Sequence, residues 1–340
     1  MPVRRGILTA GSWVVDNNKT LQAWPAEDTM NTYVELDRQG GGSGCNMAID
    51  LKKLDPSFHV ETMAIVGDDD DGRYLLGQCD QYGVQRRHMQ VIKGGTTPFS
   101  DCFNSIESGK RTHLYYPGVA EELCPDHFDF SDSGARILHL GLPGAHKKMD
   151  TPWGEDTTGW ATVLKAAGKA GLKANLEMVS TTRDRIRHFG RSCLPHLDFL
   201  IVNDYEIGAV ADVETRDGTR TLYPKVVEAL RAVFDHGSIS LAVAHFPEAA
   251  IAVTRDGNVV VAGSVSIPSS EIVGVNGAGD AFAAGVLYAS HEGQTIEDAL
   301  RMGHACAAAS MRSAATTNTV VSAGECLALA EKWGLRPAPL

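Results

Sequence analysis

Length, composition and charge limit what this chain can be. Its 340 residues, 43% hydrophobic and 21% charged, are enough for one large core or two modest ones in a globular protein. A formal net charge of -11 argues against nucleic acid or an anionic membrane as a partner, because both demand clustered Lys and Arg. No apolar stretch reaches transmembrane length, so we expect a cytoplasmic protein.

The seven cysteines are scattered and odd in number, without a CxxC pair. That pattern gives no indication of zinc or redox chemistry and predicts reduced, mostly buried thiols.

An acid follows the first predicted strand, residues 5–10. Open α/β sheets bind ligands at the carboxyl ends of their strands, so Asp16 is a candidate for binding sugar hydroxyls, with a plain turn residue as the alternative. Residues 20–38 are mostly polar and include an alternating run, 32–37, that is typical of a half-exposed strand. We interpret this region as a flap.

A glycine-rich run, residues 40–46, precedes a predicted helix at 47–51. Its glycines permit close approach of the backbone to a ligand, and Asn46 offers both a donor and an acceptor to a hydroxyl. The spacing does not match the dinucleotide-binding fingerprint, because Cys45 stands where Gly or Ala is required. A Walker A motif is also missing from the sequence.

Four consecutive acids, residues 68–71, follow a predicted buried strand at 58–66. A calcium loop starting at Asp68 would need Gly at its sixth position and Glu at its twelfth, where the chain has Arg73 and Cys79. We therefore interpret the acids as the N-terminal cap of a helix.

Two apolar and aromatic runs, 98–106 and 111–116, flank residues 107–110, which have the composition of a hairpin turn. Together with the flap, this hairpin would form a small β lid over a larger body and exclude water from a reaction. A plain edge hairpin is the alternative.

Beyond residue 135 the pattern alternates between strands, at 136–140, 172–177 and 197–202, and helices, at 160–169 and from 181. This rhythm predicts a parallel sheet covered on both faces. Asn203 and Glu206 follow the last of these strands and share one face of the next helix. They could hold Mg²⁺ through water, or they could form a capping box.

The loop at 274–280 is the centre of the functional interpretation. Gly277, Ala278 and Gly279 precede Asp280 at the start of an apolar helix, so backbone N–H groups and the helix dipole would favour a phosphate there. Asp280 could then take the proton from an attacking hydroxyl. An ordinary N-cap explains the same residues.

These motifs, in this order, resemble the ribokinase-like (PfkB) carbohydrate kinases over nearly the whole chain. The resemblance implies one domain, 1–340, with a three-layer α/β/α body and a β lid at about 12–37 and 97–117. It also implies ATP as phosphoryl donor and Mg²⁺. The implied roles are a catalytic base at Asp280, an anion hole at Gly277 to Gly279, and metal ordering through Asn203 and Glu206, while Asp16, Gly41, Gly42 and Asn46 match substrate-binding positions.

The chain departs from the family pattern at two places. Gly274 and Val275 replace the usual Asp-Thr before the GAGD run, which puts activation by a monovalent cation in doubt. Residues 244–248 replace the usual Thr-Leu-Gly near the nucleotide. Asn276 is found in adenosine-kinase-like members.

The Ala-rich predicted helix at 296–312 corresponds to the family's adenine pocket, with His304, Cys306 and Asn318 at or beyond its end. Its small residues could admit a flat base or could serve helix packing. Arg111 could reach a substrate hydroxyl or the phosphate, or it could face solvent.

We predict an ATP-dependent sugar kinase that phosphorylates a monosaccharide or a related polyol. A nucleoside kinase or a non-catalytic sensing module are the alternatives. An exposed flap with an apolar underside, including Trp24, Tyr33, Phe99 and Phe103, predicts a homodimer formed through the lid.

Overall fold

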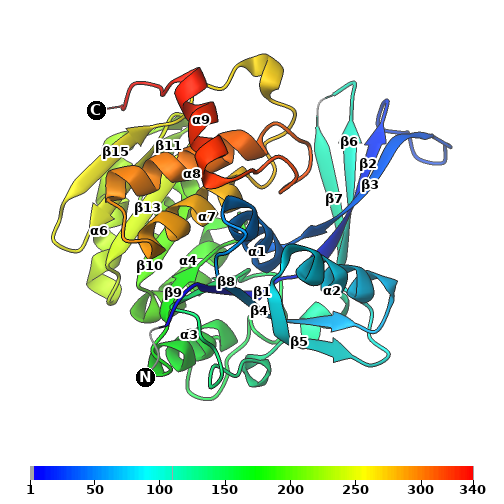
Figure 1. Ribbon diagram of the computed structural model, residues 1–340, viewed down its shortest axis with the longest axis horizontal. Helices are drawn as coiled ribbons and strands as arrows, with labels where there is room; N and C mark the ends of the chain where they lie inside the picture. The colour runs from blue at the N-terminus through cyan, green and yellow to red at the C-terminus, as the bar shows by residue number, and fades with distance from the viewer. Residues whose placement is uncertain (1–3, 109, 340) are drawn as a thin grey trace.

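A nine-stranded sheet forms the centre of the computed structural model, which describes residues 4–108 and 110–339 (Figure 1). Its strands are β1 (Ile7–Gly11), β4 (Val60–Gly67), β5 (Gln85–Ile92), β8 (Ile137–Gly141), β9 (Lys173–Leu176), β10 (Phe199–Asn203), β13 (Leu241–Phe246), β14 (Ala249–Thr254) and β15 (Val259–Gly263). They lie in the order β15-β14-β13-β10-β9-β8-β1-β4-β5. Pairs from β13 to β5 are parallel, and β14 and β15 extend the sheet antiparallel.

Helices cover both faces of this sheet (Figure 1). One face carries α1 (Ser43–Leu54), α2 (Asp70–Tyr82), α7 (Ala278–His291), α8 (Ile296–Ser310) and α9 (Ala323–Trp333). The other carries α3 (Gly159–Lys169), α4 (Arg183–Cys193), α5 (Asp204–Ala211) and α6 (Tyr223–Ala232). The predicted α/β class is confirmed.

Strand alternation divides the core in two. In β1, Ile7 faces the cluster under α1 and α7, while Leu8 faces the cluster under α3 and α4. Because both faces are covered, the central strands are apolar on both sides, as expected for parallel strands. This placement brings the carboxyl ends of β1, β8, β9 and β10 to one edge of the sheet, where the loops into the helices can hold a ligand.

Shorter elements complete the described part of the chain. They are the two-stranded sheet of β11 (Arg216–Asp217) and β12 (Arg220–Thr221), and the 3-10 helices η1 (Gly118–Glu122), η2 (Pro125–His127), η3 (Leu194–His196), η4 (Val233–His236) and η5 (Ser269–Glu271).

A separate four-stranded sheet, called the small sheet below, stands at one side of the body (Figure 1). Its strands are β2 (Val14–Leu21), β3 (Tyr33–Gly41), β6 (Phe99–Ser105) and β7 (Arg111–Tyr116), in the order β3-β2-β6-β7. The predicted hairpin and flap thus join in one sheet through the parallel pairing of β2 with β6. Gly109, in the predicted turn, lies outside the described residues.

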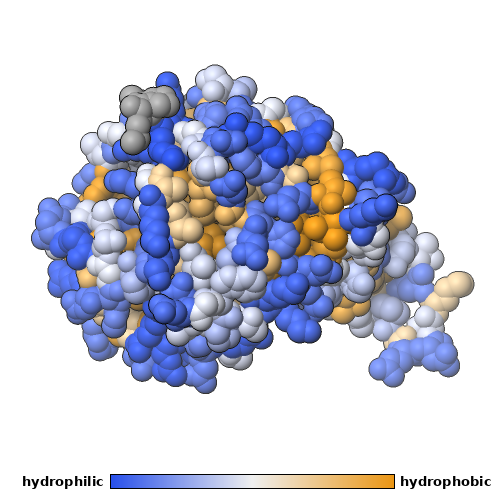
Figure 2. All heavy atoms as spheres, turned by 90° about the horizontal axis from the view of Figure 1, so that it is seen from below, coloured by the Kyte–Doolittle hydropathy of each residue, from blue (hydrophilic) through white to orange (hydrophobic). Residues whose placement is uncertain are grey.

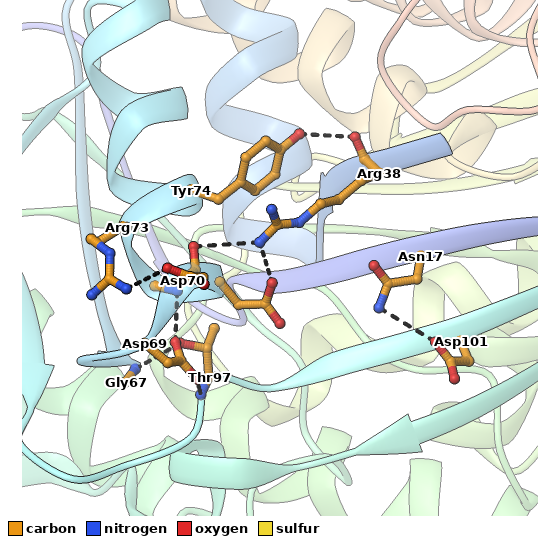
Figure 3. Close-up of polar contacts among 11 residues, drawn as sticks. Asn17, Arg38, Gly67, Asp69, Asp70, Arg73, Tyr74, Thr97 and Asp101 are labelled. Carbon is orange, nitrogen blue, oxygen red and sulfur yellow. Dashed lines mark hydrogen bonds and ion pairs between the residues drawn. The ribbon is translucent and has the colours of Figure 1, made fainter. Parts of the chain in front are cut away.

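The acids at 68–71 begin a helix, as predicted, and they also attach the small sheet to the body (Figure 3). Asp69 accepts hydrogen bonds from Gly72 N at 2.8 Å and Thr97 N at 2.8 Å. Arg38 of β3 forms an ion pair with Asp71, and its carbonyl accepts a bond from Tyr74 Oη at 2.9 Å. Among the described residues, no group of three or more His, Cys, Asp or Glu side chains could hold a metal ion.

Two further predictions can be compared with the structure. All seven cysteines are free and buried, as predicted. In the described part of the chain, no helix is long and apolar enough to cross a membrane. Figure 2, seen from below, shows apolar side chains in the middle of that face with polar ones around them.

Candidate active site

Three neighbouring hollows begin where the small sheet meets the body and continue into the body. The large hollow, about 900 Å³, lies between them and is lined by Val14, Asp16, Ser100, His113 and Tyr115 of the small sheet and by body residues that include Gly42, Lys147, Arg185 and Asn276. The connecting hollow, about 210 Å³, shares Asn276 with it. The apolar hollow, about 360 Å³, shares Asn203, His245 and Gly279 with the connecting hollow. The three hollows therefore form one continuous series.

Asp16 extends into the large hollow from β2. Burial raises the pKa of Asp16 to about 6, although the nearby Arg111 guanidinium opposes this and the Asp280 carboxylate adds to it. Gly41 makes the position possible, because a Cβ there would lie 2.3 Å from Asp16 Oδ2. The carboxyl group thus presents oxygens to whatever occupies the large hollow.

Asp280 lies at the start of α7 and lines the connecting hollow. Its Oδ2 accepts a hydrogen bond from Asn46 Nδ2 at 2.7 Å, and Thr316 Oγ1 donates to Asn46 Oδ1 at 3.1 Å. Burial and the neighbouring Glu177 carboxyl raise the pKa of Asp280 well above its usual range. A raised proton affinity is what a general base needs when its substrate is a weakly acidic alcohol.

Backbone N–H groups surround the same point. Gly277 precedes α7 with a φ of +77°, and a Cβ there would lie 2.7 Å from the carbonyl oxygen of Thr316, so this turn requires glycine. The first-turn N–H groups of a helix have no intrahelical acceptors, and at Ala278 to Asp280 they lie at the positive end of the α7 dipole. The Ala278 N–H donates to the carbonyl of Val275 at 3.3 Å, so Gly279 and Asp280 supply the donors that are available to a ligand. The arrangement can bind an anion beside the Asp280 carboxyl.

Asn203 and Glu206 form a capping box at the start of α5. Asn203 Oδ1 accepts from Glu206 N at 2.8 Å, and Glu206 Oε2 accepts from Asn203 N at 3.0 Å. Glu206 Oε1 accepts from Ser180 Oγ at 2.7 Å. Both residues also line the connecting hollow, so capping does not remove them from the site.

The apolar hollow has the composition of a site for a flat ring. The Phe282 ring contacts His245 in a tilted arrangement, with centroids 4.9 Å apart, and His304 edge to face, with centroids 5.0 Å apart. Burial lowers the pKa of both histidines to about 4, so they are neutral at physiological pH. Other lining residues are Phe246, Ile272, Val275, Ala307, Ala308 and Met311.

Four predicted site residues lie outside these linings, namely Gly41, Asn46, Arg111 and Asn318. Gly41 lies against the Asp16 carboxyl and Asn46 donates to Asp280, so both remain next to lining residues. Arg111 donates to Asn18 Oδ1 at 2.7 Å and to the carbonyl of Ala314 at 3.3 Å, so it joins the small sheet to the body. Asn318 is exposed, and its carbonyl accepts from Lys53 Nζ at 3.1 Å. Helix α8 ends at Ser310, two residues before its predicted end, and His304 and Cys306 lie within it.

Several lining residues were not identified from the sequence. His113 and Tyr115 alternate along β7, and the alternation of the predicted hairpin would have assigned them to one face. Glu177 directly follows β9. Open α/β sheets bind ligands at the carboxyl ends of their strands, so the argument that made Asp16 and Asn203 candidates would also have identified Glu177.

Comparison with known proteins places this geometry in a family. The family model described as "pfkB family carbohydrate kinase" matches residues 9–323. The chain is 26% identical to an ATP-dependent ribose-1-phosphate kinase of Halopiger xanaduensis, covering 93% of this chain and 97% of that one. It is 29% identical to an adenosine kinase of Schizophyllum commune, covering 82% and 80%.

Solved structures show the same fold. The ribokinase of Arabidopsis thaliana, complexed with ribose and ATP, gives a TM-score of 0.77 at 17% identity and covers 96% of this chain and 99% of that one. The nucleoside kinase of Burkholderia thailandensis, in complex with inosine, gives 0.72 at 18% identity, covering 98% and 100%. The chain belongs to the pfkB family of carbohydrate kinases and is a phosphotransferase.

Proposed function

We propose that this kinase transfers the γ-phosphoryl group of ATP to a primary or anomeric hydroxyl of a monosaccharide or related polyol, with Asp280 as the general base. The observation that carries the proposal is the position of Asp280, Gly277 and Gly279 in the lining of the connecting hollow, which shares residues with the large hollow on one side and the apolar hollow on the other. The acceptor would occupy the large hollow and the adenine the apolar hollow, so that the γ-phosphate lies in the connecting hollow.

In this reaction Asp280 takes the hydroxyl proton as the new O–P bond forms and the bond to the ADP oxygen breaks. The N–H groups at the start of α7 stabilise the charge that develops on the transferring group. Asp16, Gly42 and Asn46 orient the acceptor, and the small sheet acts as a lid that excludes water from the reaction.

Mg²⁺ fits the connecting hollow as a cation held by phosphate oxygens and water. Both Glu206 oxygens already accept hydrogen bonds, so Asn203 and Glu206 would order its water ligands without direct coordination. When bound, the metal neutralises charge on the phosphates. Activity that persists in excess chelator would contradict this assignment.

A screen of sugars, polyols and nucleosides in a coupled ADP-release assay tests the proposed reaction. With the accepted substrate, Asp280→Asn should retain acceptor binding and lose turnover by about 10²–10⁴. Near wild-type turnover in that variant would remove Asp280 from the role of base.

Nucleoside phosphorylation is the second candidate. The large hollow, at about 900 Å³, has room for a base beside the sugar, and Val14, Tyr115, Leu142 and Val179 give it apolar walls. The same screen separates the two, since a nucleoside kinase would prefer nucleosides to the free sugars. A non-catalytic sensor would release no ADP with any of them.

We also propose a homodimer formed partly through residues 12–37 and 97–117. Small-sheet side chains such as Val34, Leu36 and Leu114 are 59%, 64% and 58% exposed. A second subunit would remove this apolar surface from water.

A further inference from the structure

A buried row of polar side chains lies behind the proposed base. Thr9, His139 and Asn175 occupy matched positions on β1, β8 and β9, on the sheet face covered by α1 and α7. All three are fully buried, at 0% exposure. Their neighbours on this face, such as Ile7 and Ile137, are apolar. A polar row in an apolar layer is costly unless each group is hydrogen-bonded.

The hydrogen bonds of this row fix the proton on His139. Ile201 N donates to Asn175 Oδ1 at 3.2 Å, so the Asn175 amide turns its Nδ2 toward His139 Nδ1, at 3.0 Å. Nδ1 must therefore accept, and the ring proton lies on Nε2. Nε2 donates to Glu177 Oε2 at 2.8 Å. Burial lowers the pKa of His139 to about 4, so the ring is neutral.

Glu177 in turn meets Asp280. Both side chains line the connecting hollow, Glu177 from the residue after β9 and Asp280 from the first turn of α7, and the Glu177 carboxyl is close enough to raise the pKa of Asp280. Two adjacent carboxyl groups cannot readily both ionise. Burial raises the pKa of Glu177 to about 7, and the pKa of Asp280 is also raised. The other titratable groups acting on this pair are Asp16 on β2, Asp50 on α1, His139 on β8 and Glu206 on α5.

We propose that Glu177, held by His139 and Asn175, is a positioning residue for Asp280, and that the two carboxyl groups share one proton. The inference rests on the proposed kinase function. The pair would then face ATP with one negative charge instead of two, which reduces repulsion of the γ-phosphate. It still has room for the hydroxyl proton, which Asp280 takes during transfer and which passes to water after the products leave.

Glu177→Gln is the sharpest kinetic test. Gln retains an acceptor for His139 Nε2 but carries no exchangeable carboxyl proton, so the pKa of Asp280 should fall. We expect the acidic limb of the kcat/KM profile to move down by about one pH unit. Glu177→Ala should lower kcat about tenfold or more while the acceptor KM stays within about threefold.

Glu61→Gln is the matched control. Glu61 is a buried carboxyl that pairs with the partly exposed His59, at 2.7 Å, and does not line the three hollows. Its pH profile should equal that of the wild type. The proposal would be overturned if the acidic limb of Glu177→Gln coincided with the acidic limbs of the wild type and Glu61→Gln.

A stability measurement tests the pair without turnover. A proton shared in the folded state and lost on unfolding makes stability fall as pH rises toward the raised pKa values. At pH 9, Glu177→Gln and Asp280→Asn should each raise Tm relative to the wild type, and the double variant should gain no more than one of them. Additive gains would overturn the shared proton. Failure of the substrate screen would reject the kinase reaction and leave this result standing.

Discussion

The proposed role of Asp16 in binding the acceptor leads to a prediction about pH. Its pKa is raised to about 6, so its carboxylate is available to substrate hydroxyls above that pH and is lost below it. We predict that the acceptor KM rises about tenfold per pH unit below pH 6, and that Asp16→Asn raises KM at all pH values and removes this dependence.

Steady-state kinetics between pH 5 and 8 measure this effect, with His113→Gln as the control. His113 lines the same hollow, and burial lowers its pKa from the usual value. The control should keep the wild-type dependence. If Asp16→Asn also keeps the wild-type pH dependence of the acceptor KM, another group is responsible for that dependence.

Asp50 is a buried carboxyl in α1, and neither of its side-chain oxygens has a hydrogen-bond partner among residues 4–108 and 110–339. Burial, with a smaller effect of Asp280, raises its pKa well above the usual range. The folded state thus keeps a proton that the unfolded chain has lost at neutral pH, so stability falls as pH rises above the unfolded value.

Asp50→Leu should therefore stabilise the fold by about 1–3 kcal/mol at pH 7. The gain in Tm should be larger at pH 8 than at pH 5. Asp50→Asn separates the two causes, since it removes the titration but keeps unpaired polar atoms. A lower Tm in both variants would mean that the carboxyl has a stabilising partner.

At the scale of elements, a substitution in the capping box of α5 can separate the two roles of Glu206, capping the helix and the proposed ordering of Mg²⁺. Glu206→Gln keeps an oxygen for the Asn203 N–H but loses the charge, so helix stability should change little. We predict that the Mg²⁺ concentration for half-maximal rate rises about tenfold, with a smaller change in acceptor KM.

Helix α9 offers the control. Ser322 and Glu325 form the same capping box outside the linings of the three hollows. Glu325→Gln should leave the Mg²⁺ dependence unchanged. If Glu206→Gln has the same Mg²⁺ dependence as the wild type, Glu206 acts only in capping α5.

Elements whose local pattern matches their environment could be predicted from the sequence. Strands at 136–140, 172–177 and 197–202 are apolar because both sheet faces are covered, and their observed counterparts β8, β9 and β10 differ only at the ends. Strand β2 was missed because residues 16–19 are polar and half-buried, and only pairing with β3 and β6 makes them a strand. Helix α1 begins at Ser43 within the glycine run, before its predicted start at 47.

The candidate site shows the same division. Asp280, Gly277 and Asn203 belong to short motifs, so their grouping followed from local spacing and the family resemblance. Contacts between distant segments carry no such signal. The pairing of Glu177 with Asp280 and the attachment of Arg111 to Ala314 depend on how β9, β7 and the chain beyond α8 meet in space.

For the whole molecule, the homodimer is the main open prediction. Light scattering at micromolar concentration should give twice the 36.4 kDa chain mass. Leu36→Glu, on the exposed small sheet, should shift the protein toward monomer, because a charge there opposes apolar contact. Val91→Glu is the control, because it places the same charge on β5, at a 49% exposed position outside the small sheet. This variant should remain a dimer. A wild-type monomer with or without ligand would contradict the dimer.

The separation of the large hollow from the apolar hollow leads to a prediction about how the two substrates react. In the part of the chain that the structure describes, the two linings share no residue, and each shares residues with the connecting hollow. With the acceptor and the nucleotide in the hollows proposed for them, we predict that both are bound together and that the phosphoryl group passes directly from one to the other, without a phosphorylated enzyme. Initial rates measured over both concentrations should give intersecting double-reciprocal lines, whereas parallel lines would indicate a stored phosphoryl group.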